Sequence, residues 1–106
     1  ERSMIRHIVL WKLADFAEGN SRRDNAALIR QSLMTLPGVI PEIRSLEVHD
    51  NAGPDAGAFD LVLVSDFDDL AALERYQSHP AHKAVAAFVK AVRTDRAVVD
   101  YVVPEP

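Results

Sequence analysis

The sequence predicts one α+β domain, in which a four-stranded antiparallel sheet carries its helices on one face. Its length of 106 residues suits a single domain with one hydrophobic core. Segments with the period of a strand and segments with the period of a helix follow one another in the order β-α-β-β-α-α-β. Two of the strands are apolar on both faces, which indicates a sheet that is covered on both sides. Together these observations favour a ferredoxin-like sheet.

The N-terminal third is expected to form a strand followed by a helix. Residues 4–13 are rich in β-branched and aromatic side chains, which a pleated, buried surface favours. After a break at residues 15–20, residues 21–36 repeat apolar side chains at helical spacing. Ser21, with Asp24 three residues later, forms a capping arrangement at the start of this helix. A Leu-Pro-Gly sequence then ends the helix.

The rest of the chain supplies three more strands and two more helices. The second strand is the most polar of the four, so we expect it at an edge of the sheet. The two helices follow one another directly, and a proline opens the second of them. The predicted strands are residues 43–50, 59–67 and 96–103, and the predicted helices are residues 68–77 and 80–92.

Composition excludes several classes of function. The formal net charge is −4 and there is no basic run, which argues against nucleic-acid binding. No apolar segment approaches the ~18 residues of a membrane span, and no signal peptide is visible. The absence of cysteine excludes disulfides and thiol catalysis. We therefore expect a cytoplasmic protein with one domain at residues 4–103, and we interpret residues 1–3 as a remnant added for expression.

The strongest candidate for chemistry is the sequence Tyr-Gln-Ser-His-Pro-Ala-His at residues 76–82, at the junction of the last two helices. His82 could act as a general base, because an imidazole titrates near neutral pH. Tyr76 could donate a hydrogen bond to a carbonyl and stabilise an enolate. The alternative is a hydrogen-bonded histidine at a helix start, beside a tyrosine of the core. His79 could contact a ligand, but a helix-capping role explains it better.

Two residues of the first strand could complete a pocket. His7 lies between apolar neighbours, where a histidine is more often part of the core, unless it meets His82 in space. Trp11 is expected in the core or in the pocket wall. His79 and His82 have a proline between them and no third ligand nearby, so no metal site is predicted. No cofactor is expected either.

The second face of the sheet needs a cover, since the helices can occupy only one face. The simplest cover is the same surface of another copy, which predicts a homodimer. Arg6 and Lys12 are expected to mark the ends of the buried strip. Its apolar side chains belong to Met4, Ile8, Leu10, Val62 and Val64.

These features together resemble the stress-responsive A/B barrel (Dabb) domain family over residues 4–103. The family resemblance implies a dimeric α+β barrel, in which two four-stranded sheets face each other. The segments that carry the resemblance are residues 4–13 (MIRHIVLWKL), 36–39 (LPGV), 59–67 (FDLVLVSDF), 76–82 (YQSHPAH) and 100–101 (DY).

The resemblance also implies candidate roles, because the family includes plant stress proteins and a polyketide cyclase. In the cyclase type, the histidine that matches His82 acts as the base, the tyrosine that matches Tyr76 assists, and the histidine that matches His7 lines the pocket. This chain departs from that type at Leu61, where the cyclase has a histidine. It also departs in the first helix, which has no aromatic residue.

Three hypotheses follow for the function. The first is a small-molecule pocket between sheet and helices that catalyses proton transfer or cyclisation on a carbonyl, polyketide-like substrate. The second is a structural or stress-associated homodimer without turnover, and the third is a ligand-binding sensor. A cavity beside His82 would favour the first or the third hypothesis, whereas a filled core would favour the second.

Overall fold

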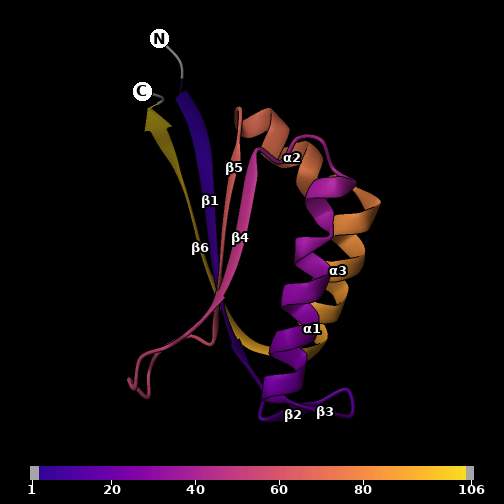
Figure 1. Ribbon diagram of the computed structural model, residues 1–106, viewed down its shortest axis with the longest axis vertical. Coiled ribbons are helices and arrows are strands. Elements are labelled where there is room, and N and C mark those ends of the chain that lie inside the picture. Colours follow the sequence, from indigo (N-terminus) through magenta and orange to yellow (C-terminus); the bar gives the residue numbers. More distant parts are fainter. Residues whose placement is uncertain (1–2, 105–106) are drawn as a thin grey trace.

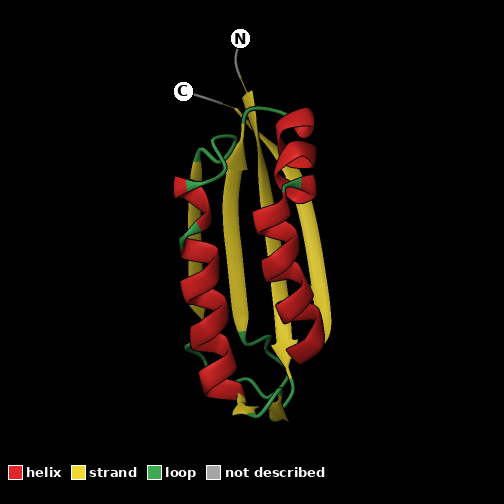
Figure 2. Cartoon of the chain, turned by 90° about the vertical axis from the view of Figure 1, so that its right-hand side faces the viewer, coloured by secondary structure: helices red, strands yellow, loops and turns green. Residues whose placement is uncertain are grey.

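A computed structural model describes residues 3–104 as one four-stranded antiparallel sheet with the helices on one face (Figure 1, Figure 2). The strand order is β4-β5-β1-β6, so the polar strand β4 lies at an edge, as predicted. This arrangement confirms the ferredoxin-like fold. The four strands are β1 (Ser3–Leu13), β4 (Ser45–Asp50), β5 (Leu61–Phe67) and β6 (Arg93–Pro104). The helices are α1 (Arg22–Met34), the short 3₁₀ helix η1 (Leu36–Gly38), α2 (Leu70–Ser78) and α3 (Pro80–Val92).

The helices begin at capped residues. The Ser21 hydroxyl accepts a hydrogen bond from the Asp24 N–H at 3.2 Å, which confirms the predicted start of α1. The Asp69 carboxylate accepts one from the Ala72 N–H at 2.8 Å at the start of α2. Within residues 3–104, none of the helices is long and apolar enough to cross a membrane.

The predicted break after β1 contains a small hairpin of β2 (Phe16–Ala17) and β3 (Asn20–Ser21). Its two turn residues, Glu18 and Gly19, have φ angles of 51° and 79°. Positive φ at both positions is the geometry of a type I′ turn. A side-chain N–H of Asn25 in α1 donates to the Ala17 carbonyl at 3.0 Å and holds the hairpin against the helix.

Several strand limits differ from the predicted ones. β1 and β6 are longer than predicted because pairing extends a strand wherever a partner is available, whereas β4 and β5 are shorter. β6 begins at Arg93, directly after α3, since β1 pairs with it as far as Leu13. At the other end Ser3 pairs with Pro104, so Ser3 belongs to β1 rather than to the expected leftover segment. The first two residues of that segment lie outside the described residues. β4 and β5 each begin two residues later than predicted.

The core lies between the sheet and the helices. Alternate residues of β1 face the helices and are buried, as the two-residue period of a strand requires. The buried face of β1 consists of Ile5, His7, Val9, Trp11 and Leu13. From the other elements the core takes Ile29, Leu33, Leu36, Ile40, Val48, Leu61, Leu63, Phe67, Ala72, Leu73, Tyr76, Val89 and Val92.

The opposite face of the sheet carries no helix (Figure 1). We call this surface, formed by the outward residues of β1, β5 and β6, the outer sheet face. Ile8 and Val64 pair across β1 and β5 on it and are half-buried, and Val99 beside Ile8 is 51% exposed. The Arg6 guanidinium forms a bidentate salt bridge with the Asp66 carboxylate, through hydrogen bonds of 2.8 and 3.0 Å. The charge of Arg6 is therefore neutralised within this largely apolar face.

Candidate functional site

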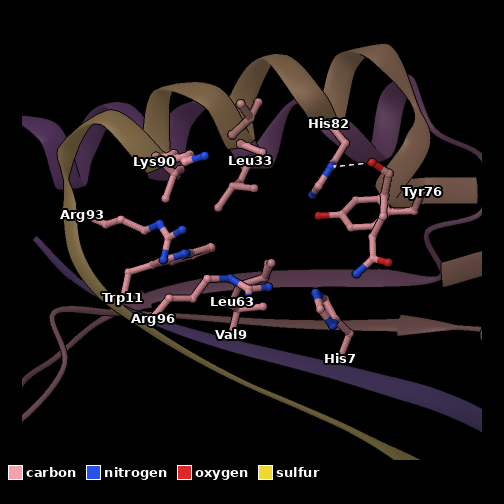
Figure 3. A pocket seen from close by; sticks show the side chains of 14 residues that line it. His7, Val9, Trp11, Leu33, Leu63, Tyr76, His82, Lys90, Arg93 and Arg96 are labelled. Atoms are coloured by element: carbon pink, nitrogen blue, oxygen red, sulfur yellow. Dashed lines mark hydrogen bonds between the residues drawn. The ribbon is translucent and has the colours of Figure 1, made fainter. Parts of the chain in front are cut away.

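A cavity of about 200 Å³ lies between the sheet and α3, and Figure 3 shows it from close by. Its floor is the inner face of β1 and β5, with His7, Val9, Trp11 and Leu63. The cavity has two chemically different ends. One end holds a tyrosine and two histidines, and the other holds three cationic side chains.

The corner between α2 and α3 brings Tyr76 and His82 together. Only His79 separates the two helices, and it caps both of them. Its Nδ1 accepts a hydrogen bond from the Ala81 N–H at 3.0 Å, and Pro80 occupies the first helical position. The ring centroids of Tyr76 and His82 lie 4.5 Å apart as a result.

The tautomer of His82 is fixed by the backbone. Its Nδ1 lies 3.1 Å from the carbonyl oxygen of Gln77. Because a carbonyl can only accept, Nδ1 carries the hydrogen, and the lone pair of the neutral ring is on Nε2. Burial lowers the pKa of His82, and the nearby His7 and the positive charge of Arg96 lower it further, against the hydrogen bond to Gln77. His82 is therefore neutral at neutral pH and able to accept a proton.

The Tyr76 hydroxyl is a donor without a partner. Tyr76 is 0% exposed, and its oxygen forms no hydrogen bond with residues 3–104. Figure 3 shows the hydroxyl pointing into the cavity. Burial raises the pKa of Tyr76 to about 12, so the proton stays on the phenol. A buried polar group without a partner is unusual in a folded protein and points to a functional role.

His7 presents a second imidazole to the same space. It is 2% exposed, and its Nδ1 lies 2.5 Å from an Asp100 carboxylate oxygen across β1 and β6. The carboxylate orients the ring, since it accepts the hydrogen of Nδ1 and leaves Nε2 for the cavity. The His7 ring stands edge-on to both Phe67 and Tyr76, with centroids 6.4 Å apart in each pair.

The opposite end of the cavity is cationic. Lys90 and Arg93 reach it from the end of α3, and Arg96 reaches it from β6 beside Trp11 (Figure 3). Sequence analysis did not identify these three residues. Lys90 follows His82 by eight residues on α3, a helical spacing that could have indicated it. Arg93 is the first residue of β6, and its place depends on pairing with Leu13. Arg96 depends on its pairing with Trp11, which the sequence does not display.

The structure therefore brings together four of the five residues predicted for the site. His7, Trp11, Tyr76 and His82 all line the cavity. His79 does not line it and caps α3 instead, in agreement with the capping interpretation. Across residues 3–104 there is no group of three or more potential metal ligands.

The fold and the cavity define an α+β domain with an internal site between a four-stranded sheet and its helices. The family model of the stress responsive A/B barrel domain matches residues 5–103. The chain belongs to this family. An uncharacterized protein of Streptomyces coelicolor is 38% identical over 84 residues, which are 79% of this chain and 84% of that protein.

Solved structures agree with this assignment. A dimeric ferredoxin-like protein from Thermobifida fusca is 29% identical with a TM-score of 0.83, over 97% of this chain and 93% of that one. Another, from Bacteroides fragilis, is 31% identical with a TM-score of 0.77, over 92% and 94%. A hydroxynitrile lyase from Passiflora edulis, 21% identical with a TM-score of 0.80 over 100% and 98%, shares the fold.

Proposed function

We propose that the protein binds a small carbonyl compound in this cavity and moves a proton at the carbon next to the carbonyl. The observation that carries the proposal is the pairing of a buried, unpartnered Tyr76 hydroxyl with a neutral His82. A hydrogen-bond donor and a base side by side are the two groups that enolisation requires.

Each group has one task in this reaction. The Tyr76 hydroxyl donates to the carbonyl oxygen of the substrate, where negative charge develops as the enolate forms. The Nε2 of His82 takes the proton from the adjacent carbon, while Nδ1 keeps its bond to the Gln77 carbonyl. His7, oriented by Asp100, presents its Nε2 to the substrate and positions it by a hydrogen bond. Ring closure of a polyketide-like chain is one reaction that such an enolate can enter.

Two further observations support a pocket rather than a purely structural role. The cavity beside His82 is open space where a structural dimer would have a filled core. The hydroxynitrile lyase with the same fold is an enzyme by name, so this architecture can carry catalysis.

The proposal is tested by proton exchange in D₂O, followed by NMR on a panel of β-keto thioesters. The native protein should accelerate exchange at the carbon between the two carbonyls. His82→Ala should abolish the acceleration, and Tyr76→Phe should reduce it less. Lys83→Ala is the matched control, since Lys83 is exposed on α3 and does not line the cavity.

An unchanged exchange rate in the His82 variant would remove His82 from the mechanism. Saturable binding without any exchange would instead favour the third hypothesis, a ligand-binding sensor. Circular dichroism of each variant must match that of the native protein for either conclusion to stand.

We further propose that the chain forms a homodimer through its outer sheet face. Structural neighbours from Thermobifida fusca and Bacteroides fragilis are described as dimeric, which supports this assembly. The outer sheet face is largely apolar and carries no helix. Face-to-face packing of two such sheets, about 10 Å apart, would cover it without any additional element.

A further inference from the structure

The cationic end of the cavity has no carboxylate at ion-pair distance among the residues that the structure describes. Lys90, Arg93 and Arg96 form no ion pair or side-chain hydrogen bond with the described residues 3–104. This is a contrast within the chain, where five other arginines each pair with a carboxylate. Those five are Arg6, Arg22, Arg30, Arg44 and Arg75.

The carboxylates nearest along β6 do not neutralise this end. Asp95 accepts a hydrogen bond from the backbone N–H of Arg96 at 2.8 Å, and its position opposite Lys12 places it on the outer sheet face. Asp100 is engaged with His7 at the other end of the cavity. The protein thus holds three positive side chains around one hollow although its formal charge is −4.

Arg93 is half-buried, whereas Lys90 and Arg96 are exposed. The three like charges around one hollow repel each other, although water weakens the repulsion at the two exposed side chains. An anion in the hollow would relieve it. Guanidinium groups bind carboxylate and phosphoryl oxygens through paired hydrogen bonds, and an ammonium group adds a third charge. The three side chains therefore have the chemistry of an anion anchor.

We propose that the ligand of this cavity carries an anionic group, a carboxylate or a phosphoryl group, which Lys90, Arg93 and Arg96 hold at the end opposite the Tyr76 hydroxyl. The inference rests on the proposed function, because it places the reacting carbonyl at Tyr76 and His82. The proposed reaction alone requires only a carbonyl group in the substrate, and the anchor specifies in addition that the substrate is anionic and which end of it carries the charge.

The dimensions and lining of the cavity fix the remaining features of the ligand. His82 and Lys90 are eight residues apart on α3, about 12 Å along the helix axis at 1.5 Å per residue. Val9, Leu63 and Val85 line the space between the two ends. The volume of about 200 Å³ lies below the roughly 300–1,000 Å³ of common ligand pockets. The ligand is therefore a small keto acid or keto phosphate in which an apolar chain separates the carbonyl from the anionic group.

Calorimetric titration with matched probes tests the anchor. The probes are 8-oxononanoate, its primary amide, and 7-oxooctylphosphonate, which share a methyl ketone and an apolar chain of six methylenes and differ in the charged end. The acid or the phosphonate should bind the native protein at least tenfold more tightly than the amide. This advantage should shrink as sodium chloride is raised, since salt screens the contact. The tighter of the two anions identifies the group that the anchor prefers.

Substitutions of the three cationic residues test whether they cause the higher affinity for the anionic probes. The triple change Lys90→Gln, Arg93→Gln and Arg96→Gln should bring the affinity for the anion down to about that for the amide. Lys83→Gln removes one positive charge from an exposed site on α3 and should change neither affinity. Arg96→Gln alone should give a partial loss, which keeps the test valid if the triple variant does not fold.

Equal affinities of the native protein for the amide and both anions, or no binding of either anion at millimolar concentration, would overturn the anchor. The proposed reaction is judged separately, by exchange of the protons next to the ketone. Binding through the cations without exchange would leave the anchor in place and refute the reaction. If the protons next to the ketone exchange as fast in the amide probe as in the acid probe, and the two probes bind with equal affinity, the reaction stays in place and the anchor is refuted.

Discussion

Tyr76 shows a conflict between stability and function at the scale of one residue. Its hydroxyl is buried without a hydrogen-bond partner in residues 3–104, and burying such a group costs about 1–3 kcal/mol. Tyr76→Phe should therefore leave the free energy of unfolding unchanged or raise it by up to about 1 kcal/mol, while it lowers the rate of proton exchange. Urea denaturation beside the exchange assay measures both. A clear loss of stability in this variant would show that the hydroxyl serves the core.

The charge state of His82 can be followed directly. Because burial and the charge of Arg96 both disfavour the imidazolium, an NMR titration should give His82 a pKa below the ordinary value of 6.5. Arg96→Gln should raise that pKa, since it removes a positive charge that opposes protonation. Lys83→Gln should leave it unchanged. A pKa of His82 at or above 6.5 in the native protein would contradict its assignment as a neutral base.

The same residue links pH to stability. The unfolded chain binds the His82 proton more tightly than the folded protein does, since the folded pKa is the lower one. The contribution of His82 to stability is therefore complete above about pH 6.5 and is lost as the pH falls through the folded pKa. His82→Gln should flatten the decline in melting temperature over this acidic range, relative to the native protein.

Local spacing predicted the residues of the site that are close in sequence, and the family resemblance added His7. Tyr76 and His82 are six residues apart across a proline, so the helix junction alone brings them together. Asp100 was not predicted as the partner of His7, because the register between the first and last strands is set by tertiary pairing. The three cations of the anchor were not predicted, because the sequence does not show that the end of α3 and the start of β6 meet at one cavity.

At the scale of elements, the β2–β3 hairpin offers a test of local strain. Glu18 has a φ of 51°, a region that a residue with a Cβ enters at a cost, whereas asparagine tolerates it well. Glu18→Asn should stabilise the protein by roughly 0.5–1 kcal/mol, seen as a higher melting temperature. Glu18→Ala is the matched control and should give no comparable gain. A lower melting temperature for the asparagine variant would mean that the Glu18 side chain is needed.

The long elements were predicted closely and the short ones were missed. α3 has the predicted limits, because Pro80 fixes its start and its apolar stripe is regular. The β2–β3 hairpin was expected only as a break, since two-residue strands have no periodicity to detect. Strand ends shifted by one to three residues for a related reason. A strand continues for as long as its neighbour offers a partner, and the sequence does not show that neighbour.

At the scale of the whole molecule, the proposed homodimer depends on the outer sheet face. Exposure of this apolar surface costs on the order of 25 cal/mol per Å². Ile8→Asp or Val62→Asp should place an unpaired charge in the interface and give a destabilised monomer or an aggregate. Val39→Asp is the control, since Val39 is exposed outside the sheet and should leave the dimer intact. Sedimentation velocity at micromolar concentration distinguishes these states, and a stable native monomer would refute the dimer.

The face itself could be predicted from the sequence, because the first and third strands are apolar at both odd and even positions. Arg6 was expected to end the buried strip, yet Met4 lies beyond it on the same face. The structure explains how the charge of Arg6 is accommodated inside this apolar surface, since the bidentate salt bridge with Asp66 neutralises it. The sequence could not show this ion pair, because the two residues lie 60 positions apart and meet only through the pairing of β1 with β5.

The corner at His79 also constrains how this protein can change in length. His79 is both the C-cap of α2 and the N-cap of α3, so no loop connects the two helices. A single inserted residue between Ser78 and Pro80 would turn α3 by about 100° relative to α2, given 3.6 residues per turn. His82 and Lys90 would then leave the cavity together. Insertions and deletions should be tolerated in the loop between β4 and β5, where the chain is exposed, but not at this corner.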